Sequence, residues 1–377
     1  MLKKTFIFIF FVFIFIFDVF GENQLNEIYE EQFHLSGAEK LIDCLPKETI
    51  KIMENIGINR KDFREIPKLS PLTLFDEIIK KTQEKFVLPM KSVSPIIAVI
   101  LLCAMIDSVD FSLGNTQISE IMSAIGSICI CTCIIGPIVK FIVATSSVIK
   151  TVSSFILCFI PIMVGIMLAS GQAVSASTYH MMMTGAGQLI FGLCTDFLVP
   201  LMNTMLGISV MSSVAPRLKL DGICNIIYKI IKSALGVSAS LFTALLALQT
   251  LVAAPADNIN GKAAKFALSS FVPIVGSALG DAFVTIHSCL KLLKSGVGVF
   301  SIISVIILFL PALIECLIWI FLLSVTSSVS DILAQRKISV LLASASKVLQ
   351  ILLAIIMSCI AVIIVSTVII LIIGGSN

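Results

Sequence analysis

Three acidic residues interrupt stretches of the sequence that are otherwise apolar: Asp196, Asp281 and Glu315. A charged side chain inside a bilayer costs free energy, so such residues usually face a bundle interior or a water-filled cavity, where they mark paths for ions or substrates. The chemistry they suggest is a polar pathway or a contact between helices. A position at the depth of the lipid headgroups is the alternative; for Asp196 and Glu315 the internal position is favoured.

The most unusual segment of the sequence runs from residue 262 to Asp281. Pro273 removes a backbone donor and breaks a helix, and Gly276 and Gly280 form a small-residue face on which two helices can approach closely. Freed backbone groups are tolerated in a membrane only against protein or a water-filled cavity, so we expect this segment to face the protein interior. The candidate pathway or structural residues are Lys265, Pro273, Gly276, Gly280, Asp281, Glu315 and Asp196.

A fainter copy of this pattern lies upstream, where residues 159–165 (FIPIMVG) resemble residues 271–276 (FVPIVG). Paired segments interrupted by Pro and Gly are typical of transporters that are built from repeats. A chance match in a chain rich in Ile, Gly and Pro is the alternative, and the sequence leaves both open.

The sequence lacks the motifs of known enzyme classes: it has no P-loop, no zinc-protease helix and no dinucleotide-binding fingerprint. Matches to a Ser-x-x-Lys pattern at residues 147–150 and 344–347 are short and have no accompanying motif. Cys129, Cys131 and Cys133 alternate, and alternate residues point about 200° apart on a helix. We therefore expect no enzyme, with no catalytic, cofactor or metal site. The lack of a long basic run argues against nucleic-acid binding.

The elements that must position these residues are transmembrane helices. Hydrophobic residues make up 58% of the chain and charged residues 13%, whereas soluble domains are about 45–50% apolar and about 25% charged. A span needs about 20 apolar residues, so the sequence predicts an all-α, polytopic transmembrane helical bundle of about seven to nine spans within residues 91–377. The expected spans cover roughly residues 93–109, 119–139, 151–170, 186–212, 234–254, 266–286, 297–325 and 350–373.

Residues 1–21 have the pattern of a secretory signal peptide, in which two lysines precede a short apolar run that Asp18 ends. An uncleaved anchor helix is the alternative, and both place the following segment outside the cytoplasm. Residues 22–90 hold much of the charge and are expected to form a small extracytoplasmic helical domain, with helices starting at Pro46 and Pro71. This domain is either a docking module for another extracytoplasmic protein or a plain water-facing domain.

Two basic amphipathic segments, residues 217–232 and 336–347, are typical of helices that lie along a lipid surface. Cytoplasmic loops normally hold the excess of Lys and Arg. Counting spans from an outside N-terminus places Lys262, Lys265 and the start of the second segment in the cytoplasm, but it places the first segment outside. The sequence leaves the topology of the middle of the chain open.

Residues 265–281 together with residues 292–298 resemble the stage III sporulation protein AE family of endospore-forming bacteria. The layout is similar as well: a signal peptide, a short extracytoplasmic helical region and a polytopic body of this length. Family members carry Leu-Ser-Asp where this chain has Leu279-Gly280-Asp281.

The resemblance implies a membrane component of the channel or export apparatus that links mother cell and forespore and is needed for endospore development after engulfment. It implies partners of the stage III sporulation A-operon type, namely an ATPase and ring-forming membrane proteins, besides the lipid bilayer, and it is compatible with a homo-oligomer. The expected location is the cell membrane, multi-pass, on the mother-cell side facing the forespore. No catalytic residues are established for the family, so none is carried over. A stand-alone secondary transporter or permease for a small solute is the alternative, motivated by the paired segments and the intramembrane acids.

Overall fold

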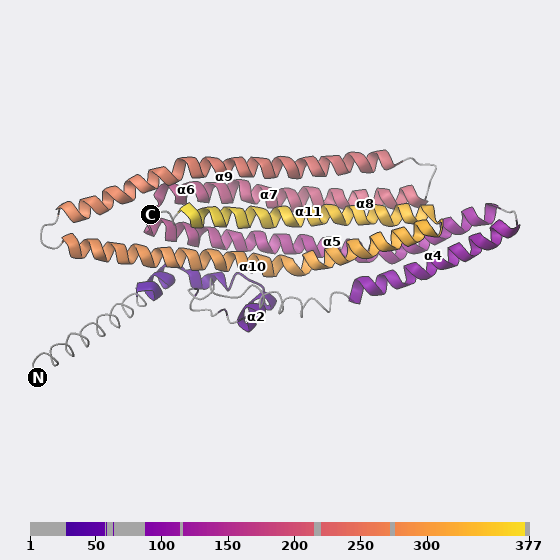
Figure 1. The fold of residues 1–377 in the computed structure, drawn as a ribbon, viewed down its shortest axis with the longest axis horizontal. Coiled ribbons are helices and arrows are strands. Elements are labelled where there is room, and N and C mark those ends of the chain that lie inside the picture. The colour runs from indigo at the N-terminus through magenta and orange to yellow at the C-terminus, as the bar shows by residue number, and fades with distance from the viewer. Residues whose placement is uncertain are drawn as a thin grey trace, which may run out of the picture.

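The computed structural model describes residues 28–56, 58, 63, 87–113, 116–214, 220–271 and 276–373. Within these ranges the regular elements are helices and no strand occurs, which confirms the predicted all-α fold. The helices form an elongated bundle in which successive long helices run antiparallel (Figure 1). Such up-and-down bundles join neighbouring helices through short connections.

The long helices are α4 (Val87–Leu113), α5 (Thr116–Ala169), α9 (Asp221–Phe271), α10 (Gly276–Ile332) and α11 (Arg336–Ile373). Between α5 and α9 lies a rod of shorter helical segments, which we call the segmented rod. It consists of α6 (Ala173–Met182), η4 (Met183–Gly187), α7 (Gln188–Gly192), η5 (Leu193–Leu198) and α8 (Val199–Val214). Both η4 and η5 are π-helical, and π-helical turns inside α-helices are frequent at functional sites.

Six helical stretches of the described chain are long and apolar enough to cross a membrane, which supports a multi-pass membrane protein. They are Pro89–Ser108, Ala124–Ala169, Ala173–Ser212, Gly222–Asp257, Thr285–Ile332 and Arg336–Ile372. The predicted number of seven to nine spans is not confirmed. The expected spans 119–139 and 151–170 both lie on α5, and the expected span 266–286 is divided between α9 and α10.

The long helices exceed the thickness of one bilayer. α5 has 54 residues and α10 has 57, which correspond to about 80 and 85 Å at 1.5 Å per residue. The hydrocarbon core of a bilayer is about 30 Å thick. A large part of each helix therefore lies outside one hydrocarbon core.

Only one of the two segments proposed as a repeat is described in full. Residues 159–165 lie inside helix α5, which continues through Pro161. Of the other segment, Phe271 ends α9 and Gly276 begins α10, and residues 272–275 lie outside the described residues. The interpretation of these segments as a structural repeat therefore stays a prediction.

The α10–α11 hairpin is closed by a tight turn in which Ala334 has φ 59°. Ser327 Oγ donates a hydrogen bond to the Ser339 carbonyl at 3.0 Å, and the Cys316 thiol donates to the Leu349 carbonyl at 3.3 Å. Small polar side chains allow membrane helices to approach closely and to bond across the interface. These contacts hold the two helices together along much of their length.

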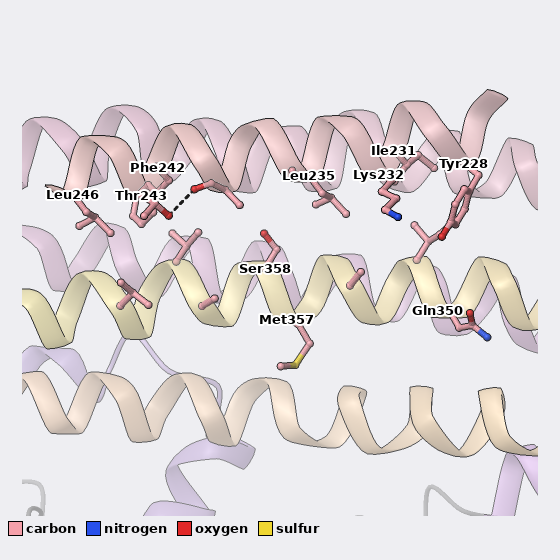
Figure 2. Close-up of a pocket in the computed structure, with 17 residues that line it drawn as sticks. Tyr228, Ile231, Lys232, Leu235, Phe242, Thr243, Leu246, Gln350, Met357 and Ser358 are labelled. Atoms are coloured by element: carbon pink, nitrogen blue, oxygen red, sulfur yellow. Dashed lines mark hydrogen bonds between the residues drawn. The ribbon is translucent and has the colours of Figure 1, made fainter. Parts of the chain in front are cut away.

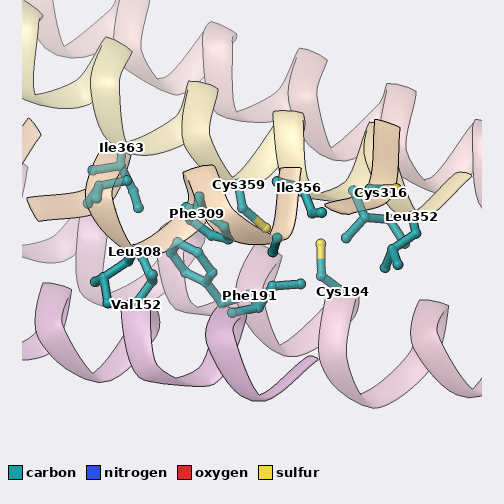
Figure 3. Packing of buried hydrophobic residues seen from close by; sticks show 14 of the residues in the cluster. Val152, Phe191, Cys194, Leu308, Phe309, Cys316, Leu352, Ile356, Cys359 and Ile363 are labelled. Carbon is teal, nitrogen blue, oxygen red and sulfur yellow. The ribbon is translucent and has the colours of Figure 1, made fainter. Parts of the chain in front are cut away.

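Large apolar side chains and thiols fill the middle of the bundle (Figure 3). Phe309 on α10 and Phe191 on α7 are buried beside residues of α11. The thiols of Cys194 and Cys359 hydrogen-bond across the same layer. Buried cysteines of this kind behave as small apolar packing residues.

The described basic residues of the two amphipathic segments lie at the same end of the bundle. α9 begins where α10 ends and α11 begins (Figure 1), and Lys232 on α9 lines the same groove as Gln350 on α11. Lys229 and Lys232 therefore share one end with Arg336 and Lys347. Counting spans from the sequence placed the two segments on opposite sides of the membrane, because that count treated residues 266–286 as a separate span.

The N-terminal part of the chain contains helical residues 28–36, η1 (Ala38–Leu41) and α2 (Lys47–Asn55). α2 begins directly after Pro46, which confirms that predicted helix start. The predicted signal peptide, and the predicted helix from Pro71, lie outside the described residues. The division of the chain into domains stays a prediction.

This N-terminal part packs along the bundle. The ring of Phe63 stacks on Phe300 of α10, with centroids 4.3 Å apart and planes 7° apart. The Phe63 carbonyl oxygen lies 2.9 Å from where a Cβ on Gly296 would stand, so the close approach needs glycine there. The Cys44 thiol contacts Cys158 on α5, and burial, followed by that contact, raises the pKa of the Cys44 thiol to about 12.

Candidate functional site

A tight turn between α5 and α6 presents the side chain of Gln172 at one end of the bundle. Gly171 has φ +75°, and the Gln172 N–H donates to the Met167 carbonyl at 2.9 Å. A glycine in the left-handed region followed by such a backward bond is a common way to end a helix. The turn thus fixes Gln172 directly before the first residue of α6.

Lys294 of α10 is buried, with an exposed fraction of 3%, and reaches this turn. Its Nζ donates a hydrogen bond to Gln172 Oε1 at 2.8 Å, across 122 residues of sequence. Burying an ammonium group is costly unless it is paired and hydrogen-bonded. A buried lysine inside an apolar helix is therefore a candidate functional residue.

Asp257 of α9 supplies the opposite charge, with an exposed fraction of 6%. Its Oδ1 accepts a hydrogen bond from the Val174 N–H at 3.0 Å, and its Oδ2 accepts one from the Ser175 N–H at 2.8 Å. These are unpaired backbone donors in the first turn of α6, where the helix dipole favours a negative charge. Asp257 thus caps α6 from another helix.

Gln172, Asp257 and Lys294 form what we call the charged cluster. Asp257 and Lys294 interact electrostatically, and the three residues tie the α5–α6 turn to α9 and α10. Such a cluster can fix the relative position of three helices, and it can also serve as a station for a proton or an ion. Within the described residues no group of three or more potential metal ligands occurs.

Buried polar atoms continue from the charged cluster along the segmented rod. Four of its side-chain atoms have no hydrogen-bond partner within the part of the chain that the structure describes: Ser175 Oγ, Tyr179 Oη, Gln188 Nε2 and Asn203 Oδ1. Ser153 of α5 donates to Gln188 Oε1 at 2.6 Å, which adds a polar contact midway. Buried polar groups are nearly always hydrogen-bonded, so unpaired ones call for water, an ion or a functional explanation. This series lies on the same rod as both π-helical turns.

Comparison with known proteins identifies the family. The family model described as "Stage III sporulation protein AE" matches residues 60–374. This chain belongs to the stage III sporulation protein AE family. The curated "Stage III sporulation protein AE" of Bacillus subtilis (strain 168) is 32% identical over 158 residues, which is 41% of this chain and 39% of that protein. No solved structure gives a match.

The structure of this AE-family chain places Asp196 on the outside of the bundle. Asp196 lies in η5, where its side chain is 72% exposed, and its Oδ1 is 3.7 Å from Lys150 Nζ of α5. The Thr195 hydroxyl donates to the same oxygen at 2.9 Å. This position corresponds to a paired surface charge rather than to the expected internal one. A pathway role for Asp196 stays a prediction.

The remaining predicted residues are separate from the charged cluster or only partly described. Glu315 is half-buried on α10, next to the buried Cys316. Pro273 lies outside the described residues. The backbones of four others belong to the end of α9 or the start of α10, and their surroundings lie outside the described part: Lys265, Gly276, Gly280 and Asp281.

Sequence reasoning missed the three members of the charged cluster as a site. Lys294 carries a usable signal, because it stands between Leu293 and a run of apolar and small residues. Asp257 gives a weaker one, as an acid near the end of an expected span. Gln172 gives none. Among the cysteines that alternate along α5, Cys129 is exposed and Cys131 is buried, so these two do not share a helix face.

Proposed function

We propose that this chain is the polytopic membrane component of the mother cell–forespore channel or export apparatus that endospore development needs after engulfment. Membership of the stage III sporulation protein AE family supports a sporulation membrane protein. The channel role rests on one further observation, the charged cluster at the head of the segmented rod. In this proposal the rod and its cluster contribute to a polar path.

The chemistry of the rod supports a path rather than a plain scaffold. An apolar bundle gains nothing from buried hydroxyl and amide atoms that lack partners. The series runs from Ser175 to Asn203, a separation of 28 residues, or about 42 Å at 1.5 Å per residue. That length exceeds the roughly 30 Å hydrocarbon core. Water or a hydrated solute beside these side chains would satisfy them.

Exposed apolar side chains support the expected protein partners. The end of the bundle that holds the charged cluster exposes Met181 (77%), Leu251 (72%) and Leu168 (52%). These side chains lie on helices that can span a membrane, so either lipid or another protein covers them. In our proposal ring-forming membrane proteins of the same assembly cover this end, and the ATPase acts from the cytoplasmic side.

The basic residues support our assignment of the orientation. Lys and Arg are enriched on the cytoplasmic side of membrane proteins, and Lys229, Lys232, Arg336 and Lys347 share one end of the bundle. We assign that end to the mother-cell cytoplasm. The charged cluster and the N-terminal segment then face the forespore side, in agreement with the predicted signal peptide.

Deletion of the gene in its endospore-forming host tests the proposal. We expect engulfment to finish and late forespore gene expression, read from a fluorescent reporter, to fail. Complementation with Lys294→Met should restore little expression, whereas Lys291→Gln, an exposed lysine one turn away on α10, should restore it. Normal sporulation past engulfment in the deletion strain would refute the proposal.

A stand-alone secondary transporter is the competing function, and the buried Lys294–Asp257 charges are its best support. Purified protein in liposomes separates the two ideas. Solute uptake by the protein alone would favour the transporter. A requirement for partner proteins in vivo, with no uptake by the protein alone, favours the assembly.

A further inference from the structure

A groove runs between α9 and α11 on the outside of the bundle. Its volume is about 650 Å³. Gly236 and Ala239 of α9 and Ala354 and Ala361 of α11 line it, and nothing lies within 4 Å of where a Cβ on Gly236 would stand. Ser358 points from α11 toward α9 (Figure 2). The small residues on both helices thus leave space for this groove, which runs along the helices and is open to the surroundings.

The two ends of this groove differ in chemistry. Tyr228 and Lys232 of α9 and Gln350 of α11 line one end (Figure 2). The other end is apolar, with Leu246 and Val365 among the lining residues. The groove therefore has a polar head and an apolar body.

The polar head is suited to an anion. The ammonium of Lys232 has no hydrogen-bond or carboxylate partner within the residues that the structure describes. The Tyr228 hydroxyl and the Gln350 amide line the same end of the groove and can donate beside it. A lysine with neighbouring neutral donors is a common arrangement for binding phosphate. Basic pockets between helices on the cytoplasmic side bind acidic lipid headgroups.

The apolar body is suited to acyl chains. From Lys232 to Leu246 the helix advances about 21 Å, slightly more than one leaflet of a hydrocarbon core that is about 30 Å thick. The outer face of α9 beside the groove is apolar as well, with Val237 64% and Leu241 59% exposed. The groove is thus open to lipid along its length.

We propose that the α9–α11 groove binds one anionic phospholipid, with its phosphate at Lys232, Tyr228 and Gln350 and its acyl chains against Gly236 and Ala361. A transmembrane helix from another chain fits less well. An apolar helix would leave the Lys232 charge without a partner.

Thermal unfolding of the purified full-length protein in a neutral detergent tests this lipid site. Phosphatidylglycerol should raise the Tm in a saturable way, while phosphatidylcholine and inorganic phosphate should not. Lys232→Gln should weaken the apparent affinity for phosphatidylglycerol about tenfold, as expected for one lost charge-assisted contact. The matched control is Lys229→Gln, because Lys229 is the exposed neighbour outside the groove lining.

A second variant tests the acyl-chain part of the groove. Ala361→Phe should abolish the phosphatidylglycerol effect while leaving Lys232 in place, and the Tm without lipid reports whether each variant folds. An equal response to phosphatidylcholine or to inorganic phosphate would overturn the proposal. So would an unchanged response in both Lys232→Gln and Ala361→Phe. If Ala361→Phe disrupts association with a second protein chain but leaves the lipid response intact, the groove is a protein interface and the lipid site is refuted.

Discussion

Replacing Lys294 by Met tests whether the charged cluster stabilises the contact between three helices. Lys294 is 3% exposed and its Nζ lies 2.8 Å from Gln172 Oε1. A hydrogen bond to a charged group contributes about 1.5–3 kcal/mol. Met retains most of the apolar stem and removes the cost of burying an ammonium group, so the two effects partly cancel. We expect the variant to be less stable by about 1–2 kcal/mol.

The assay is a double-mutant cycle on the free energy of unfolding, measured by SDS titration in mixed micelles. The variants are Lys294→Met, Gln172→Leu and the pair. Residues in direct contact couple by about 0.5–3 kcal/mol, so the double variant should lose about 1 kcal/mol less than the sum of the single variants. Lys291→Gln, on the same helix but exposed, should change stability by less than about 0.5 kcal/mol. Single-variant losses that add within about 0.3 kcal/mol would refute a cluster that acts as a unit.

Three further predictions concern neighbouring parts of the molecule. Asp257→Ala removes the cap of α6, so it should lower the free energy of unfolding by about 1–2 kcal/mol in the same assay. Asp257→Asn keeps one acceptor and should lower it less. If both variants were as stable as the parent, the cap would be contradicted. Gly296→Ala should loosen the N-terminal segment by colliding with the Phe63 carbonyl, seen as faster limited proteolysis, whereas Gly165→Ala, with nothing within 4 Å of its Cβ, should not. The pKa of the Cys44 thiol is raised to about 12, so that thiol is neutral near pH 8. In a variant that keeps Cys44 as its only cysteine, iodoacetamide labelling should be slow at pH 8 and faster at pH 10, and labelling at pH 8 as fast as that of a free cysteine would contradict the raised pKa.

Local signals explain what the sequence predicted well. The high apolar fraction predicts helices that span a membrane, because only helices and closed barrels satisfy their backbone groups in lipid. The helix start after Pro46 follows from the fixed φ of proline, which suits the beginning of a helix. Each of these features depends on a few consecutive residues.

Long-range contacts and changes of helical phase explain what the sequence did not predict. Lys294 and Gln172 are 122 residues apart, and no local pattern indicates that they meet. Asp196 was expected inside the bundle, yet it lies outside, within the π-helical turn η5. A π turn inserts extra backbone and rotates the following side chains, so regular α-helical spacing no longer predicts which face is buried. The predicted number of spans is not confirmed for a related reason: the expected spans 119–139 and 151–170 both lie on α5, which continues through Pro137 and Pro161.

The apolar length of the bundle bears on how this AE-family chain can work. The apolar stretch Thr285–Ile332 has 48 residues, or about 72 Å of helix. Even at a tilt of about 40° it extends about 55 Å along the bilayer normal, against a hydrocarbon core of about 30 Å. About 25 Å of this helix therefore lies beyond one hydrocarbon core, and its two ends carry most of its polar residues, among them Lys291, Lys294 and Asp331. The N-terminal segment covers a part of it, where Phe63 stacks on Phe300. In our proposal other protein covers the rest, and this length of helix is one reason to propose a subunit of an assembly in preference to a transporter that acts alone.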